Sequence, residues 1–136
     1  MEYITLANGY QLPMLGYGTL HIPPKQTKEC VLKAFEAGYR LLDTAASYQN
    51  EKEIGEAIKE SKLKREEIYL TTKVWVQDAG YENTLQAFHQ SLENLGVDYL
   101  DLYLIHQPYG DYYGSWKAME ELYQQGKIKA IGVCNF

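Results

Sequence analysis

The chain has 136 residues, 46% of them hydrophobic and 23% charged, proportions typical of one soluble globular domain that spans residues 1–136. The net charge of −5 is modest and the lysines and arginines are scattered among acids, which disfavours binding to nucleic acid or to an anionic membrane surface and favours a small-molecule partner. No apolar run approaches the roughly 20 residues of a membrane span and the first residues do not form a signal peptide, so we expect a cytoplasmic protein.

The chain opens with a predicted β-hairpin over about residues 3–13. Two short alternating runs, 3–6 and 10–12, flank Ala7-Asn8-Gly9, and Asn-Gly between such runs is a strong hairpin signal. We expect this hairpin to precede the main fold, which would occupy about residues 15–136.

After the hairpin, runs typical of strands alternate with runs typical of helices. The strand-like runs cover residues 15–19, 39–43, 68–73, 100–106 and 130–134. Between them apolar residues recur at helical spacing in three groups: Val31, Ala34 and Phe35; Ile54, Ala57 and Ile58; Leu85, Phe88, Leu92 and Leu95. Single helices between strands predict right-handed crossovers and a parallel sheet buried on both faces, with strands that are hydrophobic throughout.

Local signals mark the ends of these helices. Gly38 and Gly96 stand where two of the helices should end, because glycine readily adopts the left-handed conformation that follows a helix. Asn50, with Glu53 three residues later, predicts a capping box at the start of the second helix.

Five strand–helix units fit two architectures. One is a flavodoxin-like doubly wound sheet, and the other is a β/α barrel that stops after five of its eight strands. A flavodoxin-like receiver or nucleotide-binding domain needs clustered acids or a phosphate loop after the first strand, and residues 16–20 offer neither. In both architectures functional groups gather at the carboxyl ends of the strands, so those positions decide the function.

Ionisable residues of four different types meet at these strand ends. Asp43, Lys73 and His106 end three successive predicted strands, and Tyr48 follows in the loop after Asp43. Each alone has an ordinary interpretation, since aspartate often forms turns and a strand-end lysine is usually solvated. Together they predict one rim on which all four side chains converge.

The chemistry that uses this set is carbonyl reduction. Hydride transfer to a carbonyl carbon places negative charge on its oxygen, and a positioned acid must supply a proton. Tyr48 is the candidate acid, and a neighbouring Lys73 ammonium would make it a better proton donor by stabilising phenolate. An ion pair with Asp43 would hold Lys73 charged, and His106 would donate a hydrogen bond to the carbonyl oxygen.

The hydride must come from a bound cofactor, because the sequence shows no redox-active side chain or metal cluster. Gly16 and Gly18 give G-x-G without the third glycine of a dinucleotide fingerprint. Cys30 and Cys134 lie far apart, so we expect reduced thiols and no metal site. Other candidates are read as a pocket wall or packing residue (Trp75), as helix core (Trp116) and as surface residues (His21 and His89).

The sequence resembles the aldo-keto reductases over nearly its whole length. The resemblance rests on Gly38-Tyr39-Arg40-Leu41-Leu42-Asp43-Thr44-Ala45 with Tyr48, on the strand end Thr72-Lys73, on Leu104-Ile105-His106, and on the first-strand motif Leu12-Pro13-Met14-Leu15-Gly16-Tyr17-Gly18-Thr19. It implies the N-terminal portion of a (β/α)8 TIM barrel, truncated after the fifth strand, that reduces small carbonyl substrates with NADPH. It also implies a set of cofactor-binding residues: Gly18, Thr19, Leu20, Asp43, Cys134 and Asn135.

The sequence departs from the family at the substrate pocket, which the resemblance assigns to Trp75, His106 and Gln107. Gln107 and Leu20 stand where many members have tryptophan, and Cys134 stands where serine is usual. In the family the remaining strands supply the platform under the nicotinamide, the pyrophosphate loop and the pocket for the 2′-phosphate. We therefore expect severely reduced cofactor affinity.

Two hypotheses follow. The first is a carbonyl reductase with an intact catalytic set, and the second is a catalytically inactive fragment that acts as a self-associating structural module. An unclosed barrel leaves two strand edges and an apolar inner face exposed, which favours self-association.

Overall fold

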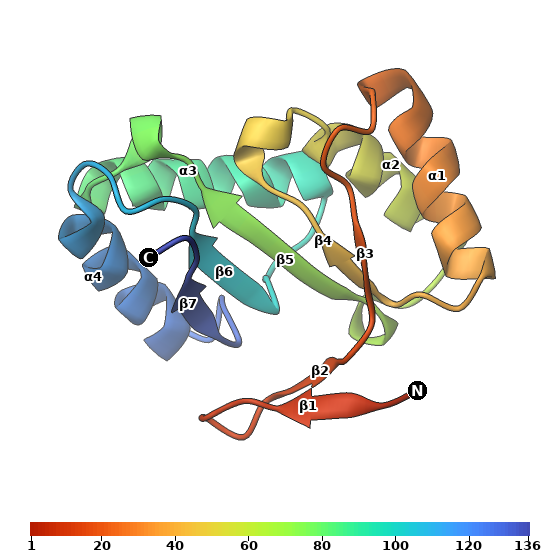
Figure 1. Ribbon diagram of the computed structural model, residues 1–136, viewed down its shortest axis with the longest axis horizontal. Coiled ribbons are helices and arrows are strands. Elements are labelled where there is room, and N and C mark those ends of the chain that lie inside the picture. Colours follow the sequence, from red (N-terminus) through yellow and green to blue (C-terminus); the bar gives the residue numbers. More distant parts are fainter.

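A five-stranded parallel sheet forms the centre of the protein. The computed structural model describes residues 1–136. The sheet consists, in chain order, of β3 (Gly16–Gly18), β4 (Leu41–Asp43), β5 (Tyr69–Val74), β6 (Leu102–Ile105) and β7 (Ile131–Val133). Each strand pairs in parallel with the next one along the chain, so the spatial order is β3-β4-β5-β6-β7 (Figure 1). A doubly wound sheet reverses its direction at a switch point, and this order has no reversal, so it has the topology of a barrel wall.

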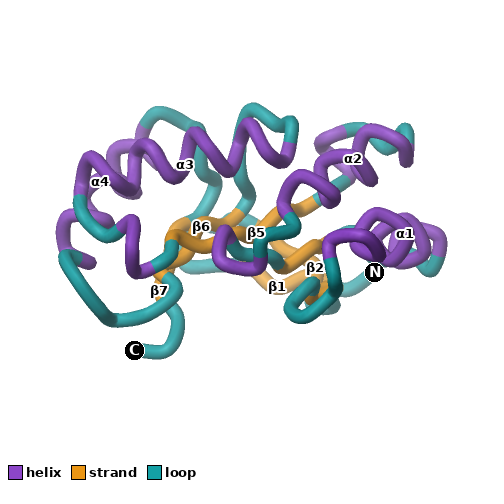
Figure 2. Tube along the Cα trace, turned by 90° about the horizontal axis from the view of Figure 1, so that it is seen from above, coloured by secondary structure: helices purple, strands orange, loops and turns teal.

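Four helices cover one face of the sheet (Figure 2). They are α1 (Pro24–Glu36), α2 (Glu51–Ser61), α3 (Tyr81–Leu95) and α4 (Tyr112–Gln124). The prediction of a sheet buried on both faces is wrong, because every crossover returns on the same side as the strands advance in one direction. Gly16, Gly18 and Asp43 are accordingly exposed on the uncovered face.

The core lies between the helices and the covered face of the sheet. Alternate residues of β5 and β6, such as Leu70 and Tyr103, point toward the helices and are fully buried there. On α3 the buried residues recur at helical spacing, and Phe88 packs against Tyr103 with ring centroids 5.6 Å apart. This packing fixes which residues of each strand face the opposite side, where the polar strand ends lie.

The predicted helix ends at Gly38 and Gly96 are confirmed. At the end of α3, Gly96 has φ 67° and the amides of Gly96 and Val97 donate to the carbonyls of Glu93 and Leu92. This is the Schellman arrangement, which satisfies helix carbonyls that otherwise lack a partner. Gly38 ends α1 in the same way, with φ 101°.

The predicted capping box at Asn50 is wrong. Asn50 does precede α2, but its side chain makes no hydrogen bond to the amides of the first turn. Its Oδ1 instead accepts a hydrogen bond from the Thr44 hydroxyl at 3.1 Å, and its Nδ2 donates to the carbonyl of Thr19 at 3.0 Å. Hydrogen bonds to Thr44 and Thr19 have replaced the expected bond to the helix amides.

The N-terminal hairpin is confirmed and lies against the amino end of the sheet (Figure 1). It pairs β1 (Tyr3–Thr5) with β2 (Gln11–Pro13). The side-chain amide of Asn8 donates to the carbonyl of Lys129 at 2.9 Å, and the Tyr10 hydroxyl donates to the Asp101 carboxylate. Burial, followed by the nearby Asp101 charge, raises the pKa of Tyr10 well above its ordinary value.

Asp101 joins the hairpin to the sheet. Only 1% of it is exposed, and its second oxygen accepts from Arg65 at 2.7 Å and from the Leu70 amide at 2.9 Å. Arg65 also donates to the carbonyl of Tyr99 at 2.8 Å and lies over the Tyr99 ring. One buried carboxylate thus connects the hairpin, β5 and the segment that leads into β6.

None of the four helices is long and apolar enough to cross a lipid bilayer.

Replacing Asp101 by asparagine should lower the free energy of unfolding by about 3 kcal/mol, because a largely buried Arg65 charge loses its partner. An asparagine NH₂ group in place of the oxygen bonded to Arg65 and Leu70 would also face two groups that can only donate. Urea denaturation measures the loss. Glu29→Gln breaks the exposed Lys33–Glu29 pair and is the matched control. It should leave the unfolding midpoint unchanged, and equal effects of the two substitutions would contradict the central role of Asp101.

Candidate active site

The carboxyl ends of β4, β5 and β6 bring the predicted catalytic residues together. Asp43 ends β4 and pairs in register with Thr71 of β5, and Lys73 lies two residues further along β5 on the same face. His106 follows the last residue of β6, and its amide donates to the carbonyl of Val74 at 3.2 Å. All three therefore lie on the uncovered face at one end of the sheet.

Lys73 is the centre of this cluster. It is 7% exposed, and its ammonium donates to the Asp43 carboxylate, to the carbonyl of Thr44 at 2.8 Å and to the Tyr48 hydroxyl at 3.4 Å. An ammonium has three hydrogens to donate, so its capacity is filled. The ion pair is asymmetric, since half of the Asp43 side chain is exposed while that of Lys73 is not.

Tyr48 reaches Lys73 because the chain turns back after β4. A single turn of 3₁₀ helix, Ala46–Tyr48, follows Ala45, and Gln49 then adopts a left-handed conformation with φ 59°. The Tyr48 ring is half-buried, and the Lys73 nitrogen lies 5.1 Å from its centroid. The phenol oxygen is thereby placed beside an ammonium at the edge of open space.

The His106 ring lies between two aromatic rings. Its centroid is 5.8 Å from that of Tyr48 and 5.1 Å from that of Trp75, both in edge-to-face contact. The Ser47 hydroxyl lies 3.5 Å from Nδ1. Burial, and secondarily the Lys73 charge, lower the pKa of His106 below its ordinary value, while the Asp43 charge acts in the opposite sense. This environment favours the neutral form of the His106 ring.

Sequence reasoning did not identify Ser47 as a neighbour of His106. The two residues are 59 positions apart and come together only because β4 and β6 flank β5. The only signal was that Ser47 lies in the same loop as Tyr48. Trp75, predicted either to wall a pocket or to pack, is half-buried against His106.

The predicted cofactor residues lie on the two sides of this cluster. Gly18 pairs with Asp43, and Thr19 follows with its amide and hydroxyl both donating to the carbonyl of Asp43. On the other side the Cys134 thiol donates to the carbonyl of His106 at 3.1 Å, and the side-chain amide of Asn135 donates to the same carbonyl at 2.7 Å. Burial raises the pKa of the Cys134 thiol, which keeps it protonated as a donor.

The rim has room for a flat ring but no partner for phosphates. A Cβ added at Gly18 would meet nothing within 4 Å, and 53% of Leu20 is exposed, so the space above β3 is open. Lys73 is the only lysine or arginine among residues 16–20, 43–48, 73–76, 106–110 and 134–136 that form the rim, and it is fully engaged. These residues fit the nicotinamide end of a dinucleotide and not its phosphates.

Gln107, predicted to line the substrate pocket, is half-buried next to His106. Its side chain makes no hydrogen bond, and its backbone carbonyl accepts from the amide of Tyr109 at 2.9 Å. The other site predictions place His21 and His89 on the surface, where both are exposed, and Trp116 in α4, where it packs against the core. Cys30 and Cys134 are both free thiols.

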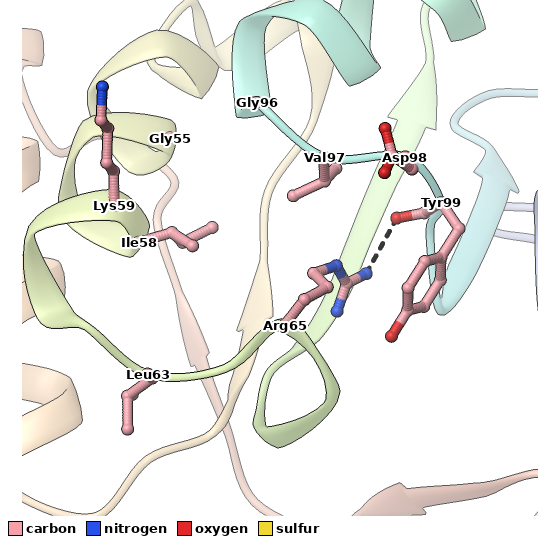
Figure 3. Close-up of a pocket in the computed structure, with 9 residues that line it drawn as sticks. All are labelled: Gly55, Ile58, Lys59, Leu63, Arg65, Gly96, Val97, Asp98 and Tyr99. Carbon is pink, nitrogen blue, oxygen red and sulfur yellow. Dashed lines mark hydrogen bonds between the residues drawn. The ribbon is translucent and has the colours of Figure 1, made fainter.

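A hollow of about 470 Å³ lies at the amino end of the sheet, where α2 and the segments that lead into β5 and β6 line it. Figure 3 shows the lining residues. The hollow separates the carboxyl ends of α2 and α3, and Arg65 lies in it with a hydrogen bond to the Tyr99 carbonyl. No predicted site residue lines it. In β/α barrels the amino end of the sheet serves stability and the carboxyl end chemistry, so the hollow does not compete with the rim as a catalytic site.

A family model described as the aldo/keto reductase family matches residues 13–136. The chain belongs to the aldo-keto reductase family. It is 51% identical over 137 residues to glyoxal reductase of Bacillus subtilis, covering 99% of this chain and 50% of that one. The chain thus spans about half the length of the curated relatives it matches.

Solved aldo-keto reductase structures have the same fold. The enzyme from Brucella melitensis superposes with a TM-score of 0.96 at 45% identity, over 99% of this chain and 54% of that one. An aldo-keto reductase from Bombyx mori in complex with NADP superposes with a TM-score of 0.91 at 35% identity, over 97% and 50%. The predicted partial (β/α)8 barrel is therefore confirmed.

The arrangement around His106 predicts its titration. In NMR spectra the midpoint of His106 should lie below 6.5, the ordinary value, because protonation would place a cation in a partly buried ring beside Lys73. Lys73→Met should raise the midpoint, since one cause of the depression is removed and Asp43 still favours the charged ring. The exposed His21 is the internal control, and a His106 midpoint unmoved by Lys73→Met would contradict the electrostatic contact.

Proposed function

We propose that this chain carries the catalytic set of a cytoplasmic NADPH-dependent reductase that converts aldehydes or ketones to alcohols. The observation that carries the proposal is the buried Lys73 ammonium, which donates hydrogen bonds to Asp43, to the Thr44 carbonyl and to the Tyr48 hydroxyl. Family membership and the NADP complex of a structural relative support the reaction class and the cofactor.

Tyr48 is the proton donor in this proposal. The carbonyl oxygen gains negative charge as its carbon is reduced, and the Tyr48 hydroxyl gives it a proton. The phenolate left behind is stabilised by the Lys73 ammonium 3.4 Å away, so the ammonium favours the transition state over the ground state. Hydrogen bonds to Asp43 and to the Thr44 carbonyl compensate for the burial of that ammonium and fix its direction.

His106 orients the substrate carbonyl. Its lowered pKa keeps it neutral, so it offers one N–H and does not compete with Tyr48 as an acid. The Ser47 hydroxyl lies 3.5 Å from Nδ1. In this proposal Nδ1 accepts from that hydroxyl, which puts the ring proton on Nε2, the nitrogen that donates to the carbonyl oxygen. A donor aimed at the negative charge that develops on the carbonyl oxygen lowers the activation barrier by a few kcal/mol.

The nicotinamide, when bound, supplies the hydride. Gly18, Thr19 and Leu20 would hold it on one side of the site, and Cys134 and Asn135 would hold it on the other. Because the rim offers no cation for the phosphates, we expect weak binding of NADPH by the chain alone. The substrate pocket, walled by Trp75 and Gln107, would take small reactive aldehydes, in keeping with the name of the glyoxal reductase relative.

Tyr48→Phe should reduce NADPH-dependent turnover of a small dialdehyde by at least about 10²-fold without changing NADPH binding, because only the proton donor is lost. Loss of NADPH absorbance measures the rate, and quenching of tryptophan fluorescence measures binding. Tyr113→Phe, on a tyrosine that is 79% exposed, is the matched control and should retain the wild-type rate. Equal rates for the two variants would remove Tyr48 from the reaction.

A second candidate is a catalytically inactive module that associates with a second copy of itself. An apolar hollow of about 310 Å³ beside the open edge of β7 favours it, lined by Ile105, Tyr112, Tyr113, Trp116, Val133 and Phe136. Unpaired strand edges with exposed apolar neighbours promote association. Binding of NADPH with turnover that depends on Tyr48 would reject this candidate as the sole function.

Under this second candidate, Val133→Lys should shift the chain from dimer toward monomer, because Val133 lies on the edge strand and is 47% exposed. A charge there would have to be desolvated on association. Light scattering after gel filtration measures the mass. Gln90→Lys adds the same charge at an exposed position of α3 and should leave the oligomeric state unchanged. A monomeric wild-type chain would dismiss the candidate.

A further inference from the structure

Asn50 has a bonding pattern that its place in the chain does not explain. It precedes α2, where an asparagine normally accepts hydrogen bonds from the first-turn amides, yet it makes none of these. It is fully buried, with Oδ1 bonded to the Thr44 hydroxyl and Nδ2 to the carbonyl of Thr19. The orientation of the amide is determined, because a carbonyl can only accept and so must face the NH₂ group.

Both partners of Asn50 lead to the catalytic cluster. The carbonyl of Thr44 accepts from the Lys73 ammonium at 2.8 Å. The amide of Thr19 donates to the carbonyl of Asp43 at 3.0 Å, and the Thr19 hydroxyl donates to the same carbonyl. Asn50 therefore closes a ring of hydrogen bonds that fastens the segment 44–50 to the loop after β3.

Thr19, Thr44 and Asn50 are all fully buried, so water cannot replace a lost partner. Each group left unpaired would carry a desolvation penalty, which makes the ring strongly preferred over any looser arrangement.

The segment 44–50 needs this fastening because it has little stability of its own. Tyr48 ends a single turn of 3₁₀ helix, a structure that is marginal in isolation. Gln49 then adopts φ 59°, a conformation unfavourable for a residue with a side chain. The next residue is Asn50, whose two tertiary hydrogen bonds stabilise the turn at the point where it is strained.

We infer that Asn50 is a positioning residue for carbonyl reduction. Its buried amide fixes the turn that carries Tyr48 and so keeps the phenol within reach of the Lys73 ammonium and the His106 ring. Asn50 acts through Thr44 and Thr19 and touches neither substrate nor cofactor. The inference rests on the proposed function, in which Tyr48 donates the proton.

The test uses NMR of the 136-residue chain, so that it does not depend on turnover. The chain has three histidines, which makes the His106 ring resonances assignable. His106 touches Tyr48, which lies on the fastened segment, and Trp75, which follows β5 and does not. The His106–Trp75 NOE is therefore an internal reference for the His106–Tyr48 NOE.

Asn50→Ala should reduce the His106–Tyr48 NOE at least about twofold relative to the His106–Trp75 NOE, because the turn is released while β5 and β6 remain in place. Thr44→Val should do the same, and Thr44→Ser, which keeps the hydroxyl, should restore the wild-type ratio. Thr84→Val is the matched control, since Thr84 is equally buried and its hydroxyl is bonded to Asp78 and Ser115 away from the site. It should lower stability and leave the ratio unchanged.

In NADPH-dependent reduction, Asn50→Ala should lower kcat about 10-fold or more with little change in KM for the aldehyde, because misplacement of the acid affects the transition state more than substrate binding. A wild-type NOE ratio in Asn50→Ala, or the same fall in the ratio for Thr84→Val, would overturn the inference. If Asn50→Ala does not fold, the Thr44→Val and Thr44→Ser pair decides. A wild-type chain without turnover would defeat the proposed function alone, because the NOE ratios still decide the role of Asn50.

Discussion

The buried ammonium of Lys73 is the constraint on which the rest of the site depends. Taking a charge out of water costs several kcal/mol unless an opposite charge and hydrogen bonds compensate for it. The compensation comes from Asp43 and Thr44, at the end of the neighbouring strand, and from Tyr48 in the loop that follows. Satisfying this one charge therefore places a carboxylate, a carbonyl and a phenol within a few ångströms of one another, as the proposed proton transfer requires. The stability of the folded strand end and the chemistry proposed for it have the same physical origin.

The sheet is fixed by polar networks at both of its ends, and these have different roles. At the amino end, Asp101 joins Tyr10 of the hairpin to Arg65 and to the Leu70 amide, a closed arrangement in which the carboxylate is almost completely buried. At the carboxyl end, the Lys73 cluster has one member, Asp43, that is half-exposed and faces open space. The apolar layer between the two networks holds the strands in register. The short turns at the carboxyl end can then carry strained residues such as Gln49 without loss of the fold.

Helices cover only one face of the sheet, and the other face is open. The order of the strands places every helix on the same side, so the strand ends of β3 to β7 form a continuous arc with an uncovered concave side. The arc contains Asp43, Tyr48, Lys73 and His106, the residues proposed to orient and protonate the carbonyl, and residues that fit a nicotinamide. It contains no cation free to bind phosphates, because Lys73, the only lysine or arginine of the rim, is engaged by Asp43 and Thr44. Because β7 is the last strand of the arc, its outer edge has no partner strand, and the apolar hollow lies beside it.

The sequence by itself determined what depends on neighbours along the chain. It predicted the Asn8-Gly9 hairpin, the five strands, the helix ends at Gly38 and Gly96, and the four ionisable residues that meet at one end of the sheet, because turn chemistry, periodicity and strand-end position are local properties. Counting strands could not separate a barrel from a doubly wound sheet, and local pattern wrongly assigned Asn50 to a capping box. Only the tertiary structure decided these points. The side chain of Asn50 bonds to a carbonyl 31 residues away and not to the nearby helix amides, and Ser47 lies beside a histidine 59 residues away. Such choices depend on which strands become neighbours, and no local interaction encodes that.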